Sequence, residues 1–549
     1  MPSSELASTD RKSTTLRRHR PPLRAGTVAG LALAIGGVVI TAIAFWWIGV
    51  SLPALMAGFE DTLSLLGRML PPEMPGPGEV VSLVAETLLI AVAGTGLATI
   101  ASLPLAFAAA RSYGSARIVR SLARLITVMT RAVPSLIFAI FFVRAFGLGP
   151  LAGGLAIAVH SIGMIAKLVT DAIDEIDHIP SDAIRACGAS RPHTAVATIF
   201  PRILPALVSI VLYRLDINIR ASAILGIVGA GGIGVALQTA LGSLDYPRAA
   251  GIICVIIALI LALELLSVLI RRRVGVADPA TIAGVSLPSS RRARHVVGWD
   301  RQRIGRFAGV AGLFGIFVIA LWSLNPDPQR LFEAWPQVQH ILTGMWPPEF
   351  SLDIVMGVLE TLLMAVGAAV VGTVGGLVLA LLTATNVAPW RTLSLVVRVL
   401  VVTARGIPDL VYALLFVAAL GLGPFAGFLA LWIAATALAA KFFTDSIEQL
   451  DPVPGEALAS LGATRPQALV AAVWPQFVPS FVSNSLFVTD LEIRQSIVLG
   501  IVGAGGIGFL LQQSVATLKY GTTSAILLSL LVLIYALEAI AQAARKRLI

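Results

Sequence analysis

The sequence predicts an all-α polytopic membrane protein with two parallel repeats of about six transmembrane helices, twelve spans in total. Hydrophobic residues make up 57% of the 549 residues, charged residues only 13%, and the mean hydropathy is +0.89. Many apolar runs reach the ~20 residues that a helix needs to cross a bilayer. A nine-residue segment, Gly226–Gly234, also recurs unchanged as Gly500–Gly508, 274 residues later. The composition and the apolar runs indicate lipid as the solvent, and the repeated segment indicates a duplicated unit.

Basic residues are concentrated beside the apolar runs, in three segments. They occur in the tail 1–24, in Arg271–Arg273 with the following linker 274–306, and in Arg545–Arg547. The positive-inside rule predicts that these segments, and therefore both termini, are cytoplasmic, with an even number of spans between successive segments. The net charge of +10 is thus explained by membrane orientation, and nucleic-acid binding is not expected.

These patterns divide the chain into four parts. We expect a disordered basic tail at 1–24, a first unit at 25–273, a flexible cytoplasmic linker at 274–306 and a second unit at 307–549. The first apolar run lacks a small-residue cleavage site, so we expect a permanent anchor in a multi-pass protein of the cytoplasmic membrane. The expected spans lie near 28–50, 83–110, 121–145, 151–172, 203–236, 247–270, 307–324, 357–384, 395–419, 425–446, 477–510 and 521–544.

The offset of 274 residues holds well beyond the glycine segment. Glu86-Thr87-Leu88 falls on Glu360-Thr361-Leu362, and Gly147–Pro150 falls on Gly421–Pro424. Since six is an even number, both units enter the membrane in the same direction, related by a pseudo-twofold axis along the bilayer normal. A pathway between the two units is therefore the default expectation.

The repeated glycines invite two interpretations of the fifth span. Their spacing matches the dinucleotide-binding fingerprint, but that motif requires a preceding strand in a soluble unit, and here both flanks are apolar helices. Clustered glycines in a membrane helix serve close packing, or a break that exposes backbone groups to a pathway, and both remain open. The glycines concerned are Gly229, Gly231, Gly232 and Gly234, with Gly503, Gly505, Gly506 and Gly508 in the second copy.

The loop after the fourth span of each unit carries a second repeated pattern. An acidic residue is followed by small or apolar residues, a glycine six positions after the acid and a later proline: Asp182, Ala183, Gly188 and Pro201, then Glu456, Ala457, Gly462 and Pro475. This pattern resembles the signature cytoplasmic (EAA) loop of ABC-importer permeases. The resemblance implies a short helix that docks in a cleft of an ATPase subunit.

The following span narrows the resemblance. Leu212–Gly226 with the glycine run resembles the permease subunit of phosphonate importers, and Leu486–Gly500 is a looser version. In that family one subunit usually contains one such unit and dimerises, whereas here two units are fused. The resemblance implies transport of phosphonate-type anions, two separate ATP-binding subunits and an extracytoplasmic substrate-binding protein. Related importers of phosphate or phosphite would look alike.

Arginines within the spans need compensation, because an isolated cation in a bilayer costs at least ~2.5 kcal/mol. Arg220 and Arg494 each follow an aspartate by four residues, Asp216 and Asp490, so that an ion pair along the helix is one explanation. The other explanation is that their guanidinium groups bind a passing phosphorus oxyanion. Arg131 and Arg405, each followed three residues later by a proline, are a second arginine pair for which contact with the oxyanion is expected on the same argument. Ser222 and Ser496 are weaker candidates for the pathway.

Several kinds of chemistry find no support in the sequence. It contains no phosphate-binding loop motif, so ATP and Mg²⁺ are expected on partner ATPase subunits and no cofactor is expected in this chain. It contains no repeated catalytic constellation, so we expect no enzyme, and neither His160 nor the two cysteines predict a metal site. An ion-coupled secondary transporter with parallel repeats remains the main alternative.

Overall fold

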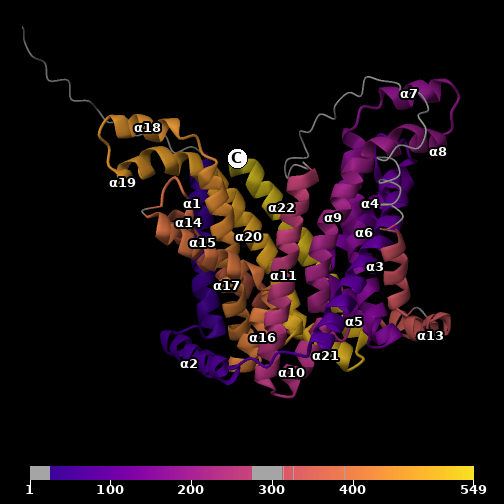
Figure 1. Cartoon of the computed structure of the whole chain (residues 1–549), viewed down its shortest axis with the longest axis horizontal. Coiled ribbons are helices and arrows are strands. Elements are labelled where there is room, and N and C mark those ends of the chain that lie inside the picture. The colour runs from indigo at the N-terminus through magenta and orange to yellow at the C-terminus, as the bar shows by residue number, and fades with distance from the viewer. Residues whose placement is uncertain (1–24, 275–311, 313, 326, 389, 549) are drawn as a thin grey trace, which may run out of the picture.

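A computed structural model describes residues 25–274, 312, 314–325, 327–388 and 390–548 of the chain. Over these residues the secondary structure is entirely helical, with no strand, as the apolar runs predict (Figure 1). The predicted tail 1–24, nearly all of the predicted linker 274–306 and the start of the second unit lie outside the described residues.

The first half contains long apolar helices interrupted by short polar ones. Its helices are α1 (Ala25–Ile48), α2 (Leu52–Arg68), α3 (Pro77–Ala109), α4 (Arg117–Ala132), α5 (Ser135–Phe146), α6 (Pro150–Glu175), α7 (Ile179–Ala186), α8 (Arg191–Thr194), the π-helix η1 (Ala195–Ile199), α9 (Phe200–Leu225), the 3₁₀-helix η2 (Gly226–Val228), α10 (Ile233–Gly242) and α11 (Tyr246–Val274).

The second half repeats this order. A short apolar helix, Phe314–Ser323, is followed by α13 (Pro328–Gly344), α14 (Leu352–Thr383), α15 (Arg391–Gly406), α16 (Asp409–Leu420), α17 (Pro424–Glu448), α18 (Val453–Ser460), α19 (Arg465–Ala468), the π-helix η4 (Leu469–Val473), α20 (Trp474–Ile501), α21 (Gly506–Ala516) and α22 (Tyr520–Leu548).

Two of the predicted spans are sharply bent instead of straight. The helices α4 and α5, predicted as one span at 121–145, meet at 89°, and α15 and α16, predicted as one span at 395–419, meet at 83°. The breaks fall at Pro134 and Pro408, where proline cannot donate a helical hydrogen bond and disfavours a helical conformation of the preceding residue. By length and apolarity, 8 helices of the described residues can cross a membrane, or up to 11 if each bent pair is one span.

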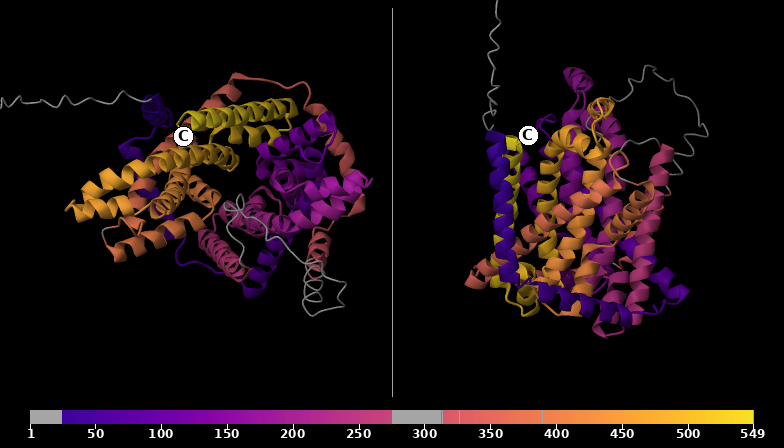
Figure 2. Two further views of the ribbon diagram at one scale, coloured as in Figure 1. Left: turned by 90° about the horizontal axis from the view of Figure 1, so that it is seen from above. Right: turned by 90° about the vertical axis from the view of Figure 1, so that its left-hand side faces the viewer.

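Two amphipathic helices lie where the sequence predicts outer loops. α2 and α13 occupy the end of the molecule opposite α7 and α18, and α2 lies across the long helices (Figure 2). α2 begins at Ser51, whose side chain accepts a hydrogen bond from the backbone N–H of Ala54, and contains charged residues on one face only. Such helices lie in the plane of the membrane interface with the apolar face toward the protein or the lipid.

The first helix of each half packs on the other half. α1 lies along α14, where the Cβ of Ala44 would be 3.1 Å from a Cβ added at Gly367. In the reverse direction, Phe317 packs on α3 so closely that a Cβ at Gly96 would lie 2.2 Å from its ring. α2 of the first half also contacts α16 of the second half, and α13 of the second half contacts α5 of the first half. Each half therefore packs its first two helices against the other half (Figure 2).

The centre of each half is a close pair of helices, α3 with α6 and α14 with α17. Their contact surfaces consist of small residues, as is usual where membrane helices approach closely. A Cβ at Gly94 would lie 2.8 Å from the carbonyl oxygen of Gly154, and one at Gly372 would lie 2.5 Å from the Cβ of Ala435. These rigid pairs carry the loops and turns described below.

Candidate functional site

Each glycine segment forms a tight turn that interrupts the fifth span. In the first half α9 ends at Leu225, and α10 begins only after Gly229, Gly231 and Gly232, whose φ angles are +86°, +86° and +75°. Residues with a Cβ rarely adopt such left-handed conformations, which explains the need for glycine here. The second copy has the same conformation, with φ angles of +98°, +80° and +69° at Gly503, Gly505 and Gly506.

The other glycines of the segment serve close packing. A Cβ at Gly226 would lie 2.7 Å from the Cα of Gly234, and one at Gly234 would lie 2.4 Å from the carbonyl oxygen of Ala223. In the second copy a Cβ at Gly508 would lie 2.0 Å from the carbonyl oxygen of Ile497. The two interpretations of the glycine segment are therefore both represented in the structure, as a break and as a packing surface.

A second repeated motif holds each turn in place. The N–H of Gly149 donates to the carbonyl of Gly229 at 2.9 Å, and the N–H of Gly423 donates to that of Gly503 at the same distance. Leu148 and Leu422 cover the turns, since a Cβ at Gly229 or Gly503 would lie 2.1 Å from the leucine side chain. The sequence repeats Gly147–Pro150 and Gly421–Pro424 are thus the partners of the glycine segments.

The repeated Glu-Thr pair caps the helix that follows each turn. Oγ1 of Thr87 accepts a hydrogen bond from the N–H of Ile233 at 2.9 Å, and Oγ1 of Thr361 accepts one from Ile507 at 2.8 Å. In the second half Oε1 of Glu360 also accepts from the N–H of Gly506 at 2.8 Å. These side chains bind N–H groups that the first turn of a helix leaves without backbone partners.

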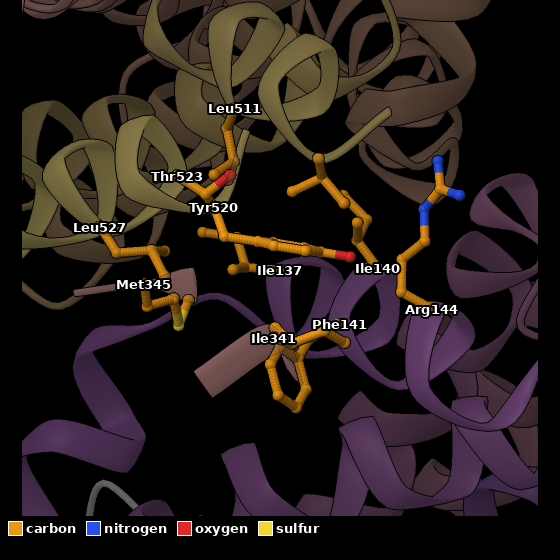
Figure 3. Close-up of a pocket in the computed structure, with 11 residues that line it drawn as sticks. Ile137, Ile140, Phe141, Arg144, Ile341, Met345, Leu511, Tyr520, Thr523 and Leu527 are labelled. Carbon is orange, nitrogen blue, oxygen red and sulfur yellow. The ribbon is translucent and has the colours of Figure 1, made fainter. Parts of the chain in front are cut away.

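A chamber of about 840 Å³ lies between the two glycine turns. Matched residues of both halves line it, including the glycines of the turns, the covering leucines and a pair of glutamines: Gly229 and Gly503, Leu148 and Leu422, Val228 and Val502, Gln238 and Gln512. Arg144 is the one charged side chain among its described lining residues. A small apolar cavity next to the chamber shares Ile140, Arg144, Val515 and Tyr520 with it (Figure 3).

The two predicted signature loops form projecting short helices, α7 and α18, at one end of the molecule (Figure 1). Asp182 and Glu456 lie in their first turns, and Ala183 and Ala457 are exposed. Gly188 and Gly462, with φ angles of +89° and +82°, end the two helices. Pro201 and Pro475 each lie in the first turn of the following long helix, α9 or α20.

Each loop is braced from the following helix. The guanidinium of Arg202 donates to the carbonyl of Asp177 at 2.7 Å, and the amide of Gln476 donates to that of Asp451 at 3.4 Å. These positions correspond across the repeat, since Arg202 precedes Gln476 by 274 residues. The brace joins the start of each loop to the long helix that leads to the glycine turn.

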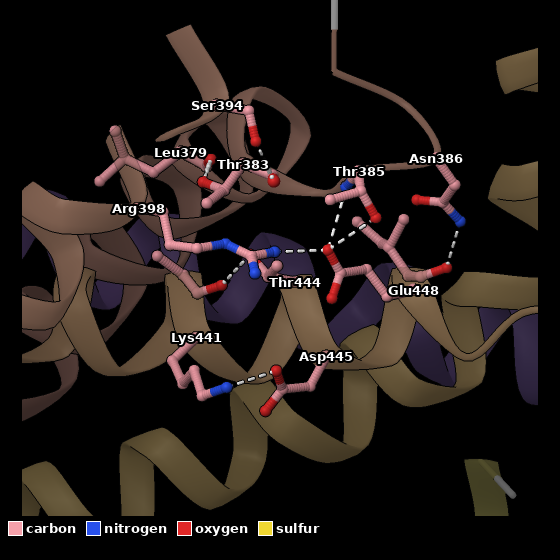
Figure 4. Close-up of polar contacts among 12 residues, drawn as sticks. Leu379, Thr383, Thr385, Asn386, Ser394, Arg398, Lys441, Thr444, Asp445 and Glu448 are labelled. Atoms are coloured by element: carbon pink, nitrogen blue, oxygen red, sulfur yellow. Dashed lines mark hydrogen bonds and ion pairs between the residues drawn. The ribbon is translucent and has the colours of Figure 1, made fainter. Parts of the chain in front are cut away.

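A carboxylate at the base of each loop ties it to the preceding hairpin. Oε1 of Glu448 accepts from the backbone N–H of Thr385 at 3.0 Å and from the guanidinium of Arg398 at 2.5 Å (Figure 4). Asp174 takes the same place in the first half, where it accepts from the backbone N–H of Ser112 at 3.0 Å. The nearby pairs Lys441–Asp445 and Lys167–Asp171 are exposed ion pairs along one helix.

The arginines predicted within the spans have neighbours of opposite charge. Arg220 lies 3.5 Å from Asp216 and Arg494 lies 3.3 Å from Asp490, so that the ion pairs expected from the spacing are present. The arginine side chains are about one-third exposed, at 32% and 30%, and therefore are not sealed in the core. Arg131 and Arg405 are half-buried beside the two proline bends and also have partners.

Ser222 and Ser496 are buried against the helix that caps the turn. The hydroxyl of Ser222 donates to the carbonyl of Thr87 at 2.8 Å, and that of Ser496 donates to its own helix at Ile493 at 2.9 Å. Their exposed fractions are 1% and 0%. In this conformation Ser222 connects two helices, and a longer hydrogen bond of 3.5 Å from Ser496 to the carbonyl of Thr361 does so in the second half. Their contact with a transported solute stays a prediction.

A buried polar network that the sequence did not reveal occurs in the first half only. Oδ1 of Asn218 accepts from the guanidinium of Arg214 at 3.2 Å and from Ser161 at 3.1 Å, while its amide donates to Thr95 at 2.9 Å. The repeat places Val488, Glu492, Ala435 and Ala369 at the corresponding positions. Oε2 of Glu492 is buried and has no hydrogen-bond partner among the described residues.

Comparisons with known proteins give the same repeat. The family model described as "Binding-protein-dependent transport system inner membrane component" matches residues 102–276 and again 372–549. The chain is 41% identical over 513 residues to the "Phosphate-import permease protein PhnE" of Mycolicibacterium smegmatis, covering 93% of each protein. It is 35% identical over 244 residues to the "Phosphite transport system permease protein PtxC" of Stutzerimonas stutzeri, covering 44% of this chain and 88% of the relative.

A third relative aligns with a still shorter part of the chain. The "Putative cryptic phosphonate transport system permease protein PhnE2" of Escherichia coli is 34% identical over 118 residues, which cover 22% of this chain and 97% of the relative.

These matches decide between the two kinds of transporter that the sequence left open. The family consists of inner-membrane permeases that carry no cofactor and that work with separate ATPase subunits and a substrate-binding protein, so the chain is a transport subunit and not an enzyme. The two matched ranges fall on the two halves described above, which makes each half one permease unit. The chain therefore belongs to the binding-protein-dependent transport system inner membrane component family, as a multi-pass permease subunit of an ABC importer with two units in one polypeptide.

Proposed function

We propose that this permease imports a small phosphorus oxyanion, of the phosphate, phosphite or phosphonate type. The observation that carries this proposal is the 41% identity to a phosphate-import permease over 93% of both proteins. Two further relatives are named for phosphite and phosphonate transport. A tetrahedral phosphorus atom with anionic oxygens is the chemistry that these three solutes share.

Two ATPase subunits are proposed to bind the permease, one at α7 and one at α18. Both helices project from the same end of the molecule and expose an alanine next to an acidic residue, Ala183 after Asp182 and Ala457 after Glu456. A short helix with small exposed residues fits into a cleft of a partner without steric conflict. The equal geometry of both loops supports two identical or similar partners.

The proposed orientation places α7, α18 and both termini in the cytoplasm. The described chain begins in α1 and ends in α22 at the same end of the molecule as the two loop helices (Figure 1). The amphipathic helices α2 and α13 and the chamber would then face outward, where the substrate-binding protein delivers the solute. The excess of basic residues at both ends of the chain supports this orientation.

Arg220 and Arg494 are proposed to contact the anion on its way through the membrane. Each lies on the helix that leads from a signature loop to a glycine turn, and each is paired with an aspartate that an oxyanion could replace. Arg131 and Arg405 lie at the bends of the neighbouring spans and are proposed for the same role. Normal uptake by Arg220→Ala and Arg494→Ala variants at normal abundance would contradict this role.

Uptake by the reconstituted complex tests the proposed function. The permease, its ATPase subunits and its binding protein are placed in proteoliposomes, and uptake of radiolabelled phosphate is measured with and without ATP. We expect ATP-dependent uptake that phosphite or methylphosphonate inhibits and sulfate does not. Uptake driven by an ion gradient without ATP, or transport of a different solute with no effect of any phosphorus oxyanion, would refute the proposal.

Docking at the loops is tested separately. Introduction of a charged side chain by Ala183→Glu or Ala457→Glu should reduce the amount of ATPase that copurifies with the permease. Ala57→Glu on α2 is the matched control, because Ala57 is also exposed but lies at the opposite end of the molecule. Equal ATPase recovery with all three variants would contradict docking at α7 and α18.

A further inference from the structure

We propose that the chamber between the glycine turns is a transit site for the phosphorus oxyanion, with Arg144 as the single positive charge among its described lining residues and Gln238 and Gln512 as neutral donors. The proposal rests on the proposed function for the class of solute. It adds a site outside the signature loops and a charged residue, Arg144, that has no match in the repeat.

The size and position of the chamber suit a hydrated anion. Its volume of about 840 Å³ is many times the ~30 Å³ that one water molecule occupies in the liquid. Both halves contribute to the lining, which includes both glycine turns, so any movement of the halves changes its shape. A solute that passes between the halves at this level must enter this space.

Arg144 has the properties of an anion-binding side chain. It lies in the last turn of α5, is exposed, and has neither a hydrogen bond nor an ion pair with any described residue. In contrast, Arg220 and Arg494 each have an aspartate within 3.5 Å. The N–H donors of the Arg144 guanidinium are therefore available to a ligand, and its planar fork matches the oxygens of a phosphorus oxyanion.

Neutral donors line the same chamber as Arg144. Gln238 and Gln512 correspond across the repeat, line the chamber from both halves, and have no hydrogen-bond partner among the described residues. Figure 3 shows the ring of Tyr520 across the adjoining small cavity, with its hydroxyl pointing toward the side on which Arg144 lies. These groups can replace part of the hydration of an anion that is attracted by Arg144.

The single charge is a consequence of the fused repeat. Position 418, which corresponds to Arg144, is an alanine. One cation with neutral donors attracts an oxyanion but holds it less tightly than two cations would. Weak binding is a requirement of transport, because the solute must also leave.

Arg144 could alternatively contact lipid headgroups at the membrane interface or stabilise the end of its own helix. A long basic side chain near the end of a span can extend to lipid headgroups, and a basic residue in the last turn stabilises a helix. Both roles need the positive charge, but neither depends on phosphate. The experiment therefore has to show protection by phosphate as well as an effect of charge.

Chemical modification of an Arg144→Cys variant distinguishes these roles in the assembled complex. Cys187 and Cys254 are first replaced by serine, since both are exposed free thiols. The new thiol is then modified with a cationic or an anionic methanethiosulfonate reagent, and uptake of labelled phosphate is measured in proteoliposomes. Because the protein has already folded before modification, a folding defect of the variant does not confound the comparison.

The expected result has three parts. Arg144→Cys lowers the rate of phosphate uptake at least about tenfold, as loss of a charge-assisted hydrogen bond predicts. The cationic reagent restores part of the uptake and the anionic reagent abolishes the remainder. Phosphate slows the modification and an equal concentration of chloride does not. Arg68→Cys in the same background is the matched control, because Arg68 is likewise an exposed arginine in the last turn of its helix but does not line the chamber.

Two results would overturn the transit site. The first is unchanged uptake by the Arg144→Cys variant, or the same effect of both reagents. The second is a modification rate that phosphate does not change. In either case the cysteine-free complex with Arg144 must transport phosphate, so this failure is distinct from a failure of the proposed function, in which that complex transports no phosphorus oxyanion.

Discussion

Replacement of Thr87 by valine should destabilise the first glycine turn. Oγ1 of Thr87 accepts a hydrogen bond from the N–H of Ile233 at 2.9 Å, and both residues have an exposed fraction of 0%. Valine has nearly the same shape but cannot accept this bond, and water cannot reach the N–H group. A buried donor without a partner costs ~1–3 kcal/mol. The same hydroxyl donates to the carbonyl of Leu83, but that loss is smaller because a carbonyl within a helix retains its backbone partner.

Thermal unfolding of the purified permease in detergent measures this loss. The Thr87→Val variant should unfold at a lower temperature than the Thr87→Ser variant, which keeps the accepting oxygen. Thr99→Val is the matched control, because the hydroxyl of Thr99 only donates to Thr95 on its own helix, at 2.7 Å. If Thr87→Val and Thr99→Val unfold at the same temperature, the hydrogen bond to Ile233 does not stabilise the turn and the reasoning is wrong.

Three further changes test the packing and the polar contacts at the base of the second loop. Glu448→Gln should release Arg398. Because the carboxylate of Glu448 ties the loop to the preceding hairpin, we expect a larger effect on ATP-dependent uptake than on the free energy of unfolding. Equal ATPase coupling in the variant and the wild type would contradict this. Gly376→Leu should prevent assembly of the second unit, since even a Cβ there would lie 2.6 Å from the Cβ of Ala439; its abundance in the membrane is the measurement, and normal abundance would refute the packing argument. Lys441→Gln removes an ion pair whose side chains are each 41% exposed, so the unfolding temperature should change little, and a large decrease would show that the pair is not a surface pair.

The repeated parts of the structure were predictable because repetition is visible in the sequence. The glycine segment, the Gly147–Pro150 motif and the Glu86-Thr87 pair were recognised from one offset, and the structure shows that they contact one another. Their chemistry explains why they were copied together: a turn with left-handed glycines requires a neighbour that binds its exposed N–H groups. The sequence did not show which motif contacts which, because the contacts join residues that are 80 to 146 positions apart.

The packing of the first helix of each half on the other half could not be predicted from the sequence. α1 is apolar on all sides, so no face of it indicates a partner. The bends at Pro134 and Pro408 were visible as prolines, but proline is tolerated in membrane helices without a sharp bend when neighbouring groups satisfy the backbone. The sequence therefore located the apolar segments near 121–145 and 395–419 but did not show the sharp bend in each.

The sequence alone does not distinguish Arg144 as a pathway residue, because the repeat does not copy it and the corresponding position 418 is an alanine. The arginines that the repeat does copy, Arg220 and Arg494, lie in ion pairs within their own helices. A residue that binds a solute between two similar halves need not be copied, since one side chain can serve the whole chamber.

Fusion of the two units into one chain permits this asymmetry. In a permease that forms a homodimer, an arginine at position 144 would occur twice and the two guanidinium groups would share one chamber. Two cations would hold an oxyanion more tightly and would repel each other when the chamber is empty, at a distance where water screens them only partly. The fused chain avoids both effects with Arg144 in one half and Ala418 in the other, and the buried network around Arg214 shows the same divergence against Val488. The turns and loops that must move together stayed alike in both halves, while the chamber lining and the helix interiors were free to differ.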